Sequence, residues 1–250
     1  MIAVLLVLRR ARLVLMAAIA CRGAVALDAA PAHVILTVPP APAAAALAGQ
    51  LTAWRQSGAI ASAQLLNVVS GARSAETVAP NPALGAVAVV EFADEAALAR
   101  WTASSEPQRV PGLVATRVDV LSRLEVTPRD SHAAVFLIAE YEIGVPPARY
   151  QGYVDGYVVP QLNAWKESGL ITGAVMYGTR ERAGAPFHAM LVLEHRDAAA
   201  FARRDAVKEG SRKELAALPS WKAWSDVKAA IRTEKFLTRA TLAAVPGPRG

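Results

Sequence analysis

The sequence is short of cysteine and of charge. Its 250 residues include a single cysteine, Cys21, and charged residues make up only 19% of the chain. Cys21 lies in an N-terminal segment that we expect to be removed, so we predict a mature chain without disulfides or thiol chemistry. Four basic residues leave with that segment: Arg9, Arg10, Arg12 and Arg22. The formal net charge of +6 therefore falls by four, to +2, and does not indicate nucleic-acid binding, which requires clustered basic residues.

Familiar catalytic and metal-binding motifs are also missing. The sequence contains no HExxH, CxxC, P-loop, GxSxG or GxGxxG pattern, so the best-known hydrolase, redox and nucleotide-binding signatures are absent. The four histidines are His33, His132, His188 and His195. They do not have the spacing of metal ligands on a helix, and we therefore predict no metal site.

Residues 1–26 have the pattern of an export signal. Basic residues precede the short apolar run of residues 13–20, and Ala24-Val25-Ala26 supplies a small-x-small cleavage pattern. That run is shorter than the roughly 20 apolar residues that span a bilayer. We expect a periplasmic or secreted protein with no stable membrane span after cleavage. Two alternatives stay open: an uncleaved N-terminal anchor, because residues 1–8 are also apolar, and a lipoprotein attached through Cys21.

Two blocks of the sequence occur twice. Residues 51–60 (LTAWRQSGAI) return as residues 162–171 (LNAWKESGLI), and residues 90–100 return as residues 193–203. Two matched blocks in the same order predict a duplicated domain. The predicted organisation is an export signal (1–26), a first repeat (27–126), a linker (127–132), a second repeat (133–243) and a tail (244–250).

Each repeat is predicted to fold as strand, helix, strand, strand, helix, strand, which is the ferredoxin-like order. In the first repeat we expect strands at 33–38, 60–69, 85–92 and 114–124, with helices from 43 to Gly58 and at 95–102. In the second we expect strands at 134–142, 171–180, 186–195 and 235–242. Its first helix begins at Pro146-Pro147 and is kinked or split by Pro160. An insertion adds a long helix to about residue 218 and another at 221–231.

One short motif resembles a known superfamily. Glu91-Phe92-x-Asp94-x-x-Ala97, at the end of a strand and the start of a helix, is similar to the dimeric α/β-barrel superfamily. That group includes antibiotic-biosynthesis monooxygenases, EthD-like proteins and stress-responsive A/B barrel proteins. The second copy departs from the motif, because His195 replaces Phe92. The resemblance implies an α+β fold in which two tandem βαββαβ units form the barrel within one chain.

His188 is the candidate catalytic residue. Strand alternation places His188, Met190, Val192 and Glu194 on one face, directed into the barrel, and Phe187, Ala189, Leu191 and Leu193 under the helices. In the ferredoxin-like order the start of this strand meets the end of the 134–142 strand, which brings Glu140 or Glu142 near His188. A carboxylate that orients an imidazole can serve as a general base. The alternative is an ion pair at the strand ends with a purely structural role.

A basic stripe marks the insertion. Arg204, Lys208 and Arg212 fall at i, i+4 and i+8, on one side of a helix. The stripe is either a solvated face with ion pairs along the helix or a lid whose cations hold an anionic ligand. For the second case the candidate ligand-binding residues are Tyr141, Trp165, Met190, Arg204, Lys208, Arg212 and Trp221. Trp165 is also explained by core packing. Only one or two of Tyr150, Tyr153 and Tyr157 are expected to share a helix face with Val154 and Val158.

Three functions stay open at this stage. The first is the binding of a small apolar or anionic molecule in a pocket of the second repeat. The second is a monooxygenase-like activity, cofactor-independent or haem-using, in the manner of the resembled superfamily. The third is a structural module that pairs through its sheets, for example as a homodimer. The sequence requires no cofactor, and haem would need His188 or His195 as its axial ligand.

Overall fold

The computed structural model describes residues 30–69, 78–125 and 133–243. The chain divides into residues 1–30 and residues 31–250, and the helices and strands of the described residues lie in the second part. The predicted export signal (1–26), linker (127–132) and tail (244–250) fall outside the described residues.

The first βαββαβ unit is close to its prediction. Its elements are β1 (Ala32–Val38), α2 (Ala43–Gln56), β2 (Ser62–Val68), β3 (Ala86–Phe92), α3 (Glu95–Ala103), the 3-10 turn η1 (Pro107–Arg109) and β4 (Val114–Leu124). Short alternating runs and well-placed prolines and glycines explain this agreement, because both signals are local.

The second unit has the same order with more helix. Its elements are β5 (Val135–Ile143), α4 (Pro147–Tyr153), the π-helical turn η3 (Val154–Val158), α5 (Val159–Glu167), β6 (Ile171–Thr179), β7 (Ala189–His195), α6 (Ala198–Ala202), α7 (Arg204–Leu215), α8 (Pro219–Ile231) and β8 (Arg232–Leu242). The single long helix expected up to residue 218 was wrong. The structure divides it at Arg203 into α6 and α7, and β8 begins earlier than predicted.

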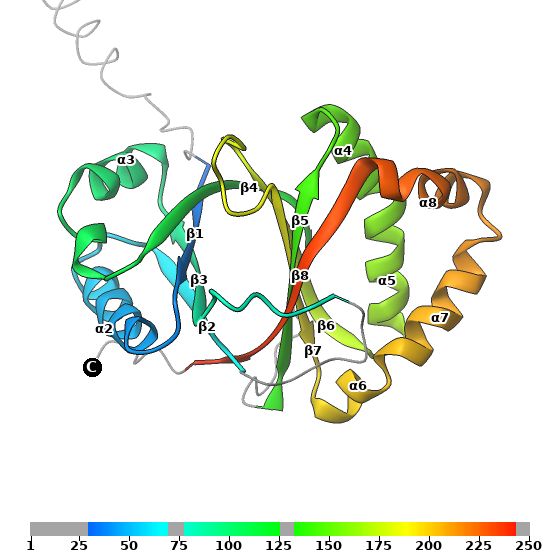
Figure 1. Cartoon of the computed structure of the whole chain (residues 1–250), viewed down its shortest axis with the longest axis horizontal. Coiled ribbons are helices and arrows are strands. Elements are labelled where there is room, and N and C mark those ends of the chain that lie inside the picture. Colours follow the sequence, from blue (N-terminus) through cyan, green and yellow to red (C-terminus); the bar gives the residue numbers. More distant parts are fainter. Residues whose placement is uncertain (1–29, 70–77, 126–132, 244–250) are drawn as a thin grey trace, which may run out of the picture. The chain divides into compact units, whose positions relative to one another are not determined.

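The eight strands of the described residues close into one barrel, in the order β1-β3-β2-β8-β5-β7-β6-β4. Each unit contributes four neighbouring strands, and the units meet where β2 pairs with β8 and β4 pairs with β6. Figure 1 shows β8 running between the two units, with α2 and α3 flanking the first and α5, α7 and α8 flanking the second. The predicted fold class, two tandem ferredoxin-like units in one α/β barrel, is confirmed.

Side chains alternate between the barrel interior and the helix-covered outer surface. Ile35, Val87, Ile138 and Val192 belong to the interior cluster. Their neighbours along the strands pack outward under the helices, in separate clusters for the two units. On β7 the prediction holds for Met190, which faces inward, and for Ala189, Leu191 and Leu193, which face the helices. It was wrong for Phe187, which precedes β7 and packs with the interior cluster.

Matching caps begin and end helices in the two units. Asp94 Oδ1 accepts the backbone N–H of Ala97 at 2.6 Å, and Asp197 Oδ1 accepts that of Ala200 at 2.7 Å. Each carboxylate satisfies a backbone donor that the first helical turn leaves free. At the other end, α2 and α5 both run into a glycine in the left-handed region, with φ of 72° at Gly58 and 69° at Gly169.

A π-helical turn separates α4 from α5, directly before Pro160. Proline has no N–H to donate to the preceding turn, and the wider π turn accommodates that loss. Gly156 lies within the turn, where a Cβ would lie 2.5 Å from Trp224 Cδ1. Tyr150, Tyr153 and Tyr157 are spaced at i, i+3 and i+7, one face of a helix, and all three are buried, as are Val154 and Val158. The expectation that only one or two would share a face was therefore wrong.

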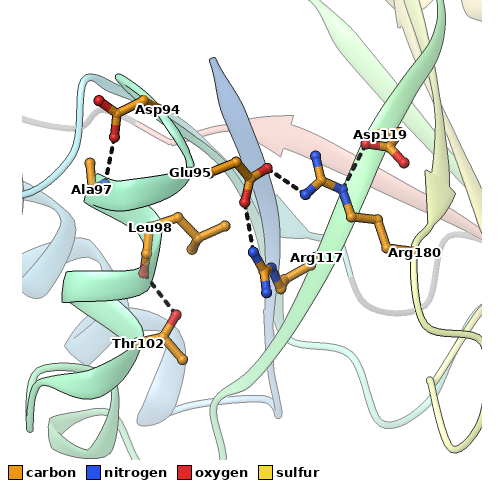
Figure 2. Close-up of polar contacts among 8 residues, drawn as sticks. All are labelled: Asp94, Glu95, Ala97, Leu98, Thr102, Arg117, Asp119 and Arg180. Atoms are coloured by element: carbon orange, nitrogen blue, oxygen red, sulfur yellow. Dashed lines mark hydrogen bonds and ion pairs between the residues drawn. The ribbon is translucent and has the colours of Figure 1, made fainter. Parts of the chain in front are cut away.

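An exposed ion-pair network joins α3 to the neighbouring strands (Figure 2). Glu95, in the first turn of α3, accepts from Arg117 Nη2 at 2.6 Å and also from Arg180. Arg180 Nε donates in turn to Asp119 Oδ1 at 2.7 Å. The two arginines lower the pKa of Glu95, chiefly through the Arg180 hydrogen bond. Arg180 follows β6, so the network connects the first unit to the second.

Candidate functional site

A cavity of about 510 Å³ lies between the outer face of the second unit's sheet and helices α5, α7 and α8, and Val78, between β2 and β3 of the first unit, also lines it. Its floor is apolar because the outward-facing residues of four strands meet there. The residues that form this floor are Leu137, Ala139, Met176, Leu191, Leu193 and Leu237. On the helix side, Val158 and Leu162 extend the apolar surface. A cavity of this size with an apolar floor is typical of small-molecule sites.

The rim of the cavity is mostly cationic. Arg204, Lys208 and Arg212 line it from α7, in the stripe seen in the sequence, and Lys228 and Arg232 join them from α8 and β8. Three carboxylates also line the cavity, namely Asp205, Glu209 and Glu234. Among the described residues of the lining, five cations against three anions leave a formal excess of two positive charges.

Part of the rim charge is already engaged within the protein. Arg204, only 4% exposed, lies 3.3 Å from Asp205, whereas Arg212 Nη1 lies 4.0 Å from Glu209 Oε2. The pKa of Lys228 is lowered, first by burial and then by the positive charges of Arg232 and Arg212. Such a crowded set of cations favours an added anion, which relieves their mutual repulsion.

Arg232 is held rigidly at the inner edge of the rim. Its guanidinium lies 4.0 Å from the centre of the Tyr141 ring, and its Nε donates to the Tyr153 hydroxyl at 2.9 Å. Nη1 is 3.4 Å from Glu234 Oε2. Burial raises the pKa of Tyr153 to about 12, so this hydroxyl stays protonated at neutral pH. Arg232 is thus a fixed positive charge beside the cavity.

Two polar side chains of α5 line the cavity without a partner. The indole Nε1 of Trp165 is buried and has no hydrogen-bond partner in the described part of the chain. Gln161, one helical turn earlier and 8% exposed, forms no side-chain hydrogen bond with any described residue. Buried polar groups are normally satisfied, so the unpartnered indole N–H of Trp165 requires an explanation, whereas the Gln161 amide is not among the fully buried atoms that lack a partner.

Stacked aromatic rings stand behind the cavity wall. The ring centroids of Tyr150 and Tyr153 are 5.9 Å apart, those of Tyr153 and Tyr157 5.0 Å, and those of Tyr157 and Trp221 4.8 Å. Trp221 Nε1 donates to the Tyr157 carbonyl at 3.1 Å. Of these four rings, only Tyr157 lines the cavity. Trp221 was predicted to wall the pocket, but it packs one layer further out.

The structure brings together five of the seven candidate ligand-binding residues. Tyr141, Trp165, Arg204, Lys208 and Arg212 all line the cavity. Met190 does not, because its position on β7 directs it into the barrel interior. Sequence reasoning missed Gln161, Lys228 and Arg232. A signal for Gln161 was available, since it lies one turn before Trp165 on the same predicted helix.

His188 does not form the predicted pair with a carboxylate. Its Nδ1 lies 3.1 Å from the backbone nitrogen of Ile143, which donates to it, and its own backbone N–H donates to the Tyr141 carbonyl. Glu142 is exposed, and neither it nor Glu140 contacts the His188 ring through a hydrogen bond or ion pair among the described residues. His188 also lies outside the cavity lining. The carboxylate-oriented base proposed for this residue is therefore not assembled.

Glu140 is instead part of the barrel interior. Its carboxylate, 2% exposed, accepts the Asn81 amide. Burial raises the pKa of Glu140, while the Asn81 hydrogen bond and Lys235 oppose that change. This glutamate belongs to a different face of β5 from Tyr141 and the cavity.

The cavity does not fit a histidine-ligated haem. No histidine or cysteine occurs among the described residues that line it. His195 is fully buried elsewhere, with Nδ1 3.3 Å from the Val135 carbonyl and its ring 5.0 Å from that of Phe201. Burial, and secondarily the charge of Arg204, lowers the pKa of His195 to about 4. Neither histidine named as an axial donor reaches the cavity.

Other kinds of site find no support in the described residues. No group of three or more histidine, cysteine, aspartate or glutamate side chains there is arranged to hold a metal ion. In the same part of the chain, none of the helices has the length and apolar character needed to cross a membrane.

The likeness to known proteins is structural. No protein-family model and no curated protein sequence matches the chain. A candidate monooxygenase from Fusobacterium nucleatum superposes with a TM-score of 0.52 at 12% identity, covering 87% of this chain and 94% of that one. An anthrone oxidase-like protein superposes with a TM-score of 0.55 at 11% identity, covering 88% and 93%. Together with the closed eight-strand barrel, these matches show that the chain has the fold of the dimeric α/β-barrel superfamily, built from two tandem units.

Proposed function

We propose that this protein binds a small amphipathic anion in the second-unit cavity. The observation that carries the proposal is the combination of an apolar floor and a cationic rim around one space of about 510 Å³. An apolar ligand body would displace water from the leucine-rich floor, at roughly 25 cal/mol for each Å² removed from water. An anionic end would meet the excess positive charge of α7 and α8. The polar rim orients the ligand, and the floor provides most of the affinity.

The two alternative functions have less support. A monooxygenase-like activity rests on a shared fold, and one fold hosts many chemistries. The base proposed for that activity, His188, lies outside the cavity. Pairing through sheets requires a free strand edge, and the eight described strands close on one another. Ligand binding is therefore the function that the geometry supports best.

Export remains part of the proposal. We infer from the basic stretch, the short apolar run and Ala24-Val25-Ala26 that residues 1–26 direct the chain out of the cytoplasm and are then removed. Sequencing the N-terminus of the protein recovered from the producing cells tests this inference. A chain that begins near residue 27 is expected. A retained residue 1 would favour the anchor, and a lipid-modified Cys21 would favour the lipoprotein.

Calorimetric titration with a matched pair of probes tests the binding function. 4-Benzylbenzoate and its neutral counterpart 4-benzylbenzamide share an apolar body and differ in charge. We expect the carboxylate to bind more tightly, with an advantage that shrinks as salt rises from about 0.05 to 0.5 M. Replacing both Lys208 and Arg212 by Gln should reduce that advantage by about three- to tenfold.

A matched charge variant completes this test. Lys222 is an exposed lysine of α8 paired with Asp226 at 2.7 Å, and it does not line the cavity. Lys222→Gln should leave both affinities unchanged. If wild-type protein binds neither probe, or binds the amide as tightly as the carboxylate at low salt, the proposed function is wrong.

A further inference from the structure

Trp54 and Trp165 occupy matching places in the two units. Each lies on the helix between the first and second strands of its unit, and each is followed by a serine whose hydroxyl donates to the tryptophan carbonyl, at 3.0 Å for Ser57 and 2.8 Å for Ser168. Both indole rings are buried, with 1% and 6% exposure. Backbone, burial and sequence context are therefore alike for the two rings.

The two indole N–H groups differ in their partners. Trp54 Nε1 donates to Glu106 Oε2 at 2.8 Å, and the same carboxylate is paired with Arg109 at 3.0 Å. In the first unit a carboxylate thus sits between an indole N–H and an arginine. Trp165 Nε1 has no partner in the described part of the chain.

The surroundings of Trp165 suit a carboxylate that the chain does not itself supply. Trp165 lines the cavity, as do Gln161 one turn earlier and the arginines of α7, which packs against α5. A carboxylate has two oxygens in one plane and can accept from both α5 donors while facing the cations, once the side chains that cover Trp165 Nε1 in the ligand-free structure move aside. An ionised acceptor also forms stronger hydrogen bonds than a neutral one.

We propose that the ligand is a monocarboxylic acid whose carboxylate accepts the Trp165 indole N–H and the Gln161 amide, in the role that Glu106 plays for Trp54. This inference rests on the proposed function. It adds the chemical group of the ligand and the residues that bind that group. It identifies Trp165 and Gln161 as the residues that distinguish a carboxylate from a neutral analogue. The ligand's apolar body then lies along the floor formed by β5, β6, β7 and β8.

NMR of the indole N–H groups, in protein labelled with ¹⁵N-tryptophan, tests directly whether the carboxylate binds at Trp165. The chain has five tryptophans, and Trp165→Phe identifies the signal of Trp165. On addition of 4-benzylbenzoate to the wild-type protein, the Trp165 indole proton is expected to shift downfield. Trp54 is already bonded to Glu106, and Trp101 has no partner among the described residues but packs in the first-unit core, so both signals serve as internal controls.

Affinities of variants provide the second readout. Trp165→Phe should weaken the binding of 4-benzylbenzoate about tenfold or more and change the affinity for 4-benzylbenzamide by less than about threefold. The reason is that a hydrogen bond to a charged group is lost only for the acid. Gln161→Leu should act in the same direction with less disturbance of the core. Trp54→Phe is the matched control and should leave both affinities unchanged.

The outcomes separate the two proposals. In one outcome the carboxylate binds without moving the Trp165 signal and with unchanged selectivity for acid over amide in both α5 variants. That result would overturn the proposed position of the carboxylate and leave the binding function intact. Binding of neither probe to the wild-type protein would overturn both. A Trp165 shift with loss of selectivity in either variant supports both.

Discussion

The side-chain amide of Asn81 donates to both carboxylate oxygens of Glu140, at 3.1 and 3.2 Å. Asn81 lies between β2 and β3, whereas Glu140 lies on β5, so the contact joins the first unit to the second inside the barrel. The Asn81 backbone also donates to the Thr238 hydroxyl at 3.0 Å. A segment of the first unit is thereby fixed on the strands of the second.

This contact predicts an unusual pH dependence. The pKa of Glu140 is raised from 4.5 by burial, so between 4.5 and the raised value the folded state holds more protons than the unfolded state. The contribution of Glu140 to the free energy of unfolding should therefore be largest below pH 4.5, fall as pH rises through that window, and stay constant above it. Glu140→Gln keeps the shape of the side chain but cannot titrate, so the contribution of this position should not change with pH. Urea unfolding of both proteins at several pH values measures it, and an unchanged profile would contradict the assignment.

His195 should act in the opposite sense. Its pKa falls from 6.5 to about 4, so between these values the unfolded state binds more protons. Its stabilising contribution is complete above about pH 6.5 and is lost as pH falls toward 4, by on the order of 3 kcal/mol. His195→Phe introduces the residue found at Phe92 in the first copy of the motif, and its unfolding free energy should decline less over this range. An equal acid loss in both proteins would show that other groups cause it.

The two tryptophans should differ in their contribution to stability. Trp54→Phe removes a hydrogen bond to a carboxylate, whereas Trp165→Phe removes an N–H that has no partner in the described chain. We expect Trp54→Phe to lower the free energy of unfolding by about 1–2 kcal/mol more than Trp165→Phe does. Chemical denaturation of the ligand-free proteins measures the difference. Equal losses would mean that ring volume alone accounts for both.

Two glycines near the π turn give a matched pair of variants. A Cβ at Gly156 would overlap the Trp224 indole, whereas one at Gly152 would be 3.4 Å from its nearest atom, Trp224 Cζ2. Gly156→Ala should therefore cost about 1–3 kcal/mol through overpacking. Gly152→Ala lies within α4 and should be neutral or stabilising by up to about 1 kcal/mol, because alanine favours helix. Thermal unfolding compares them, and a harmless Gly156→Ala would contradict the close packing of α8 on this turn.

Much of the fold could be predicted because its signals are local. Alternation along β7 placed Met190 inward and Leu191 outward, and Asp94 and Asp197 marked helix starts before any contact was known. The duplicated blocks around Trp54 and Trp165 indicated the order of strands. The barrel then followed from the resemblance of the Glu91–Ala97 motif.

The site was harder to predict because it depends on contacts between distant residues. Lys228 and Arg232 reach the rim only because α8 folds back over the sheet. Asn81 could not be recognised as the partner of Glu140, since nothing in the sequence relates a turn of one unit to a strand of the other. The missing partner of Trp165 is likewise visible only in three dimensions.

Filling the cavity is the most direct test of the central claim. Ala139 lies on the cavity floor, whereas Ala88 is a fully packed alanine in the first-unit core. Calorimetric titration with 4-benzylbenzoate should show binding to the wild-type protein, and Ala139→Phe should abolish it while remaining folded by circular dichroism. Ala88→Phe should cost more stability, because Ala88 is fully buried among the apolar side chains of the first-unit core, and should retain binding if the variant folds. Binding of 4-benzylbenzoate to folded Ala139→Phe with wild-type affinity would contradict the assignment of this cavity as the ligand site.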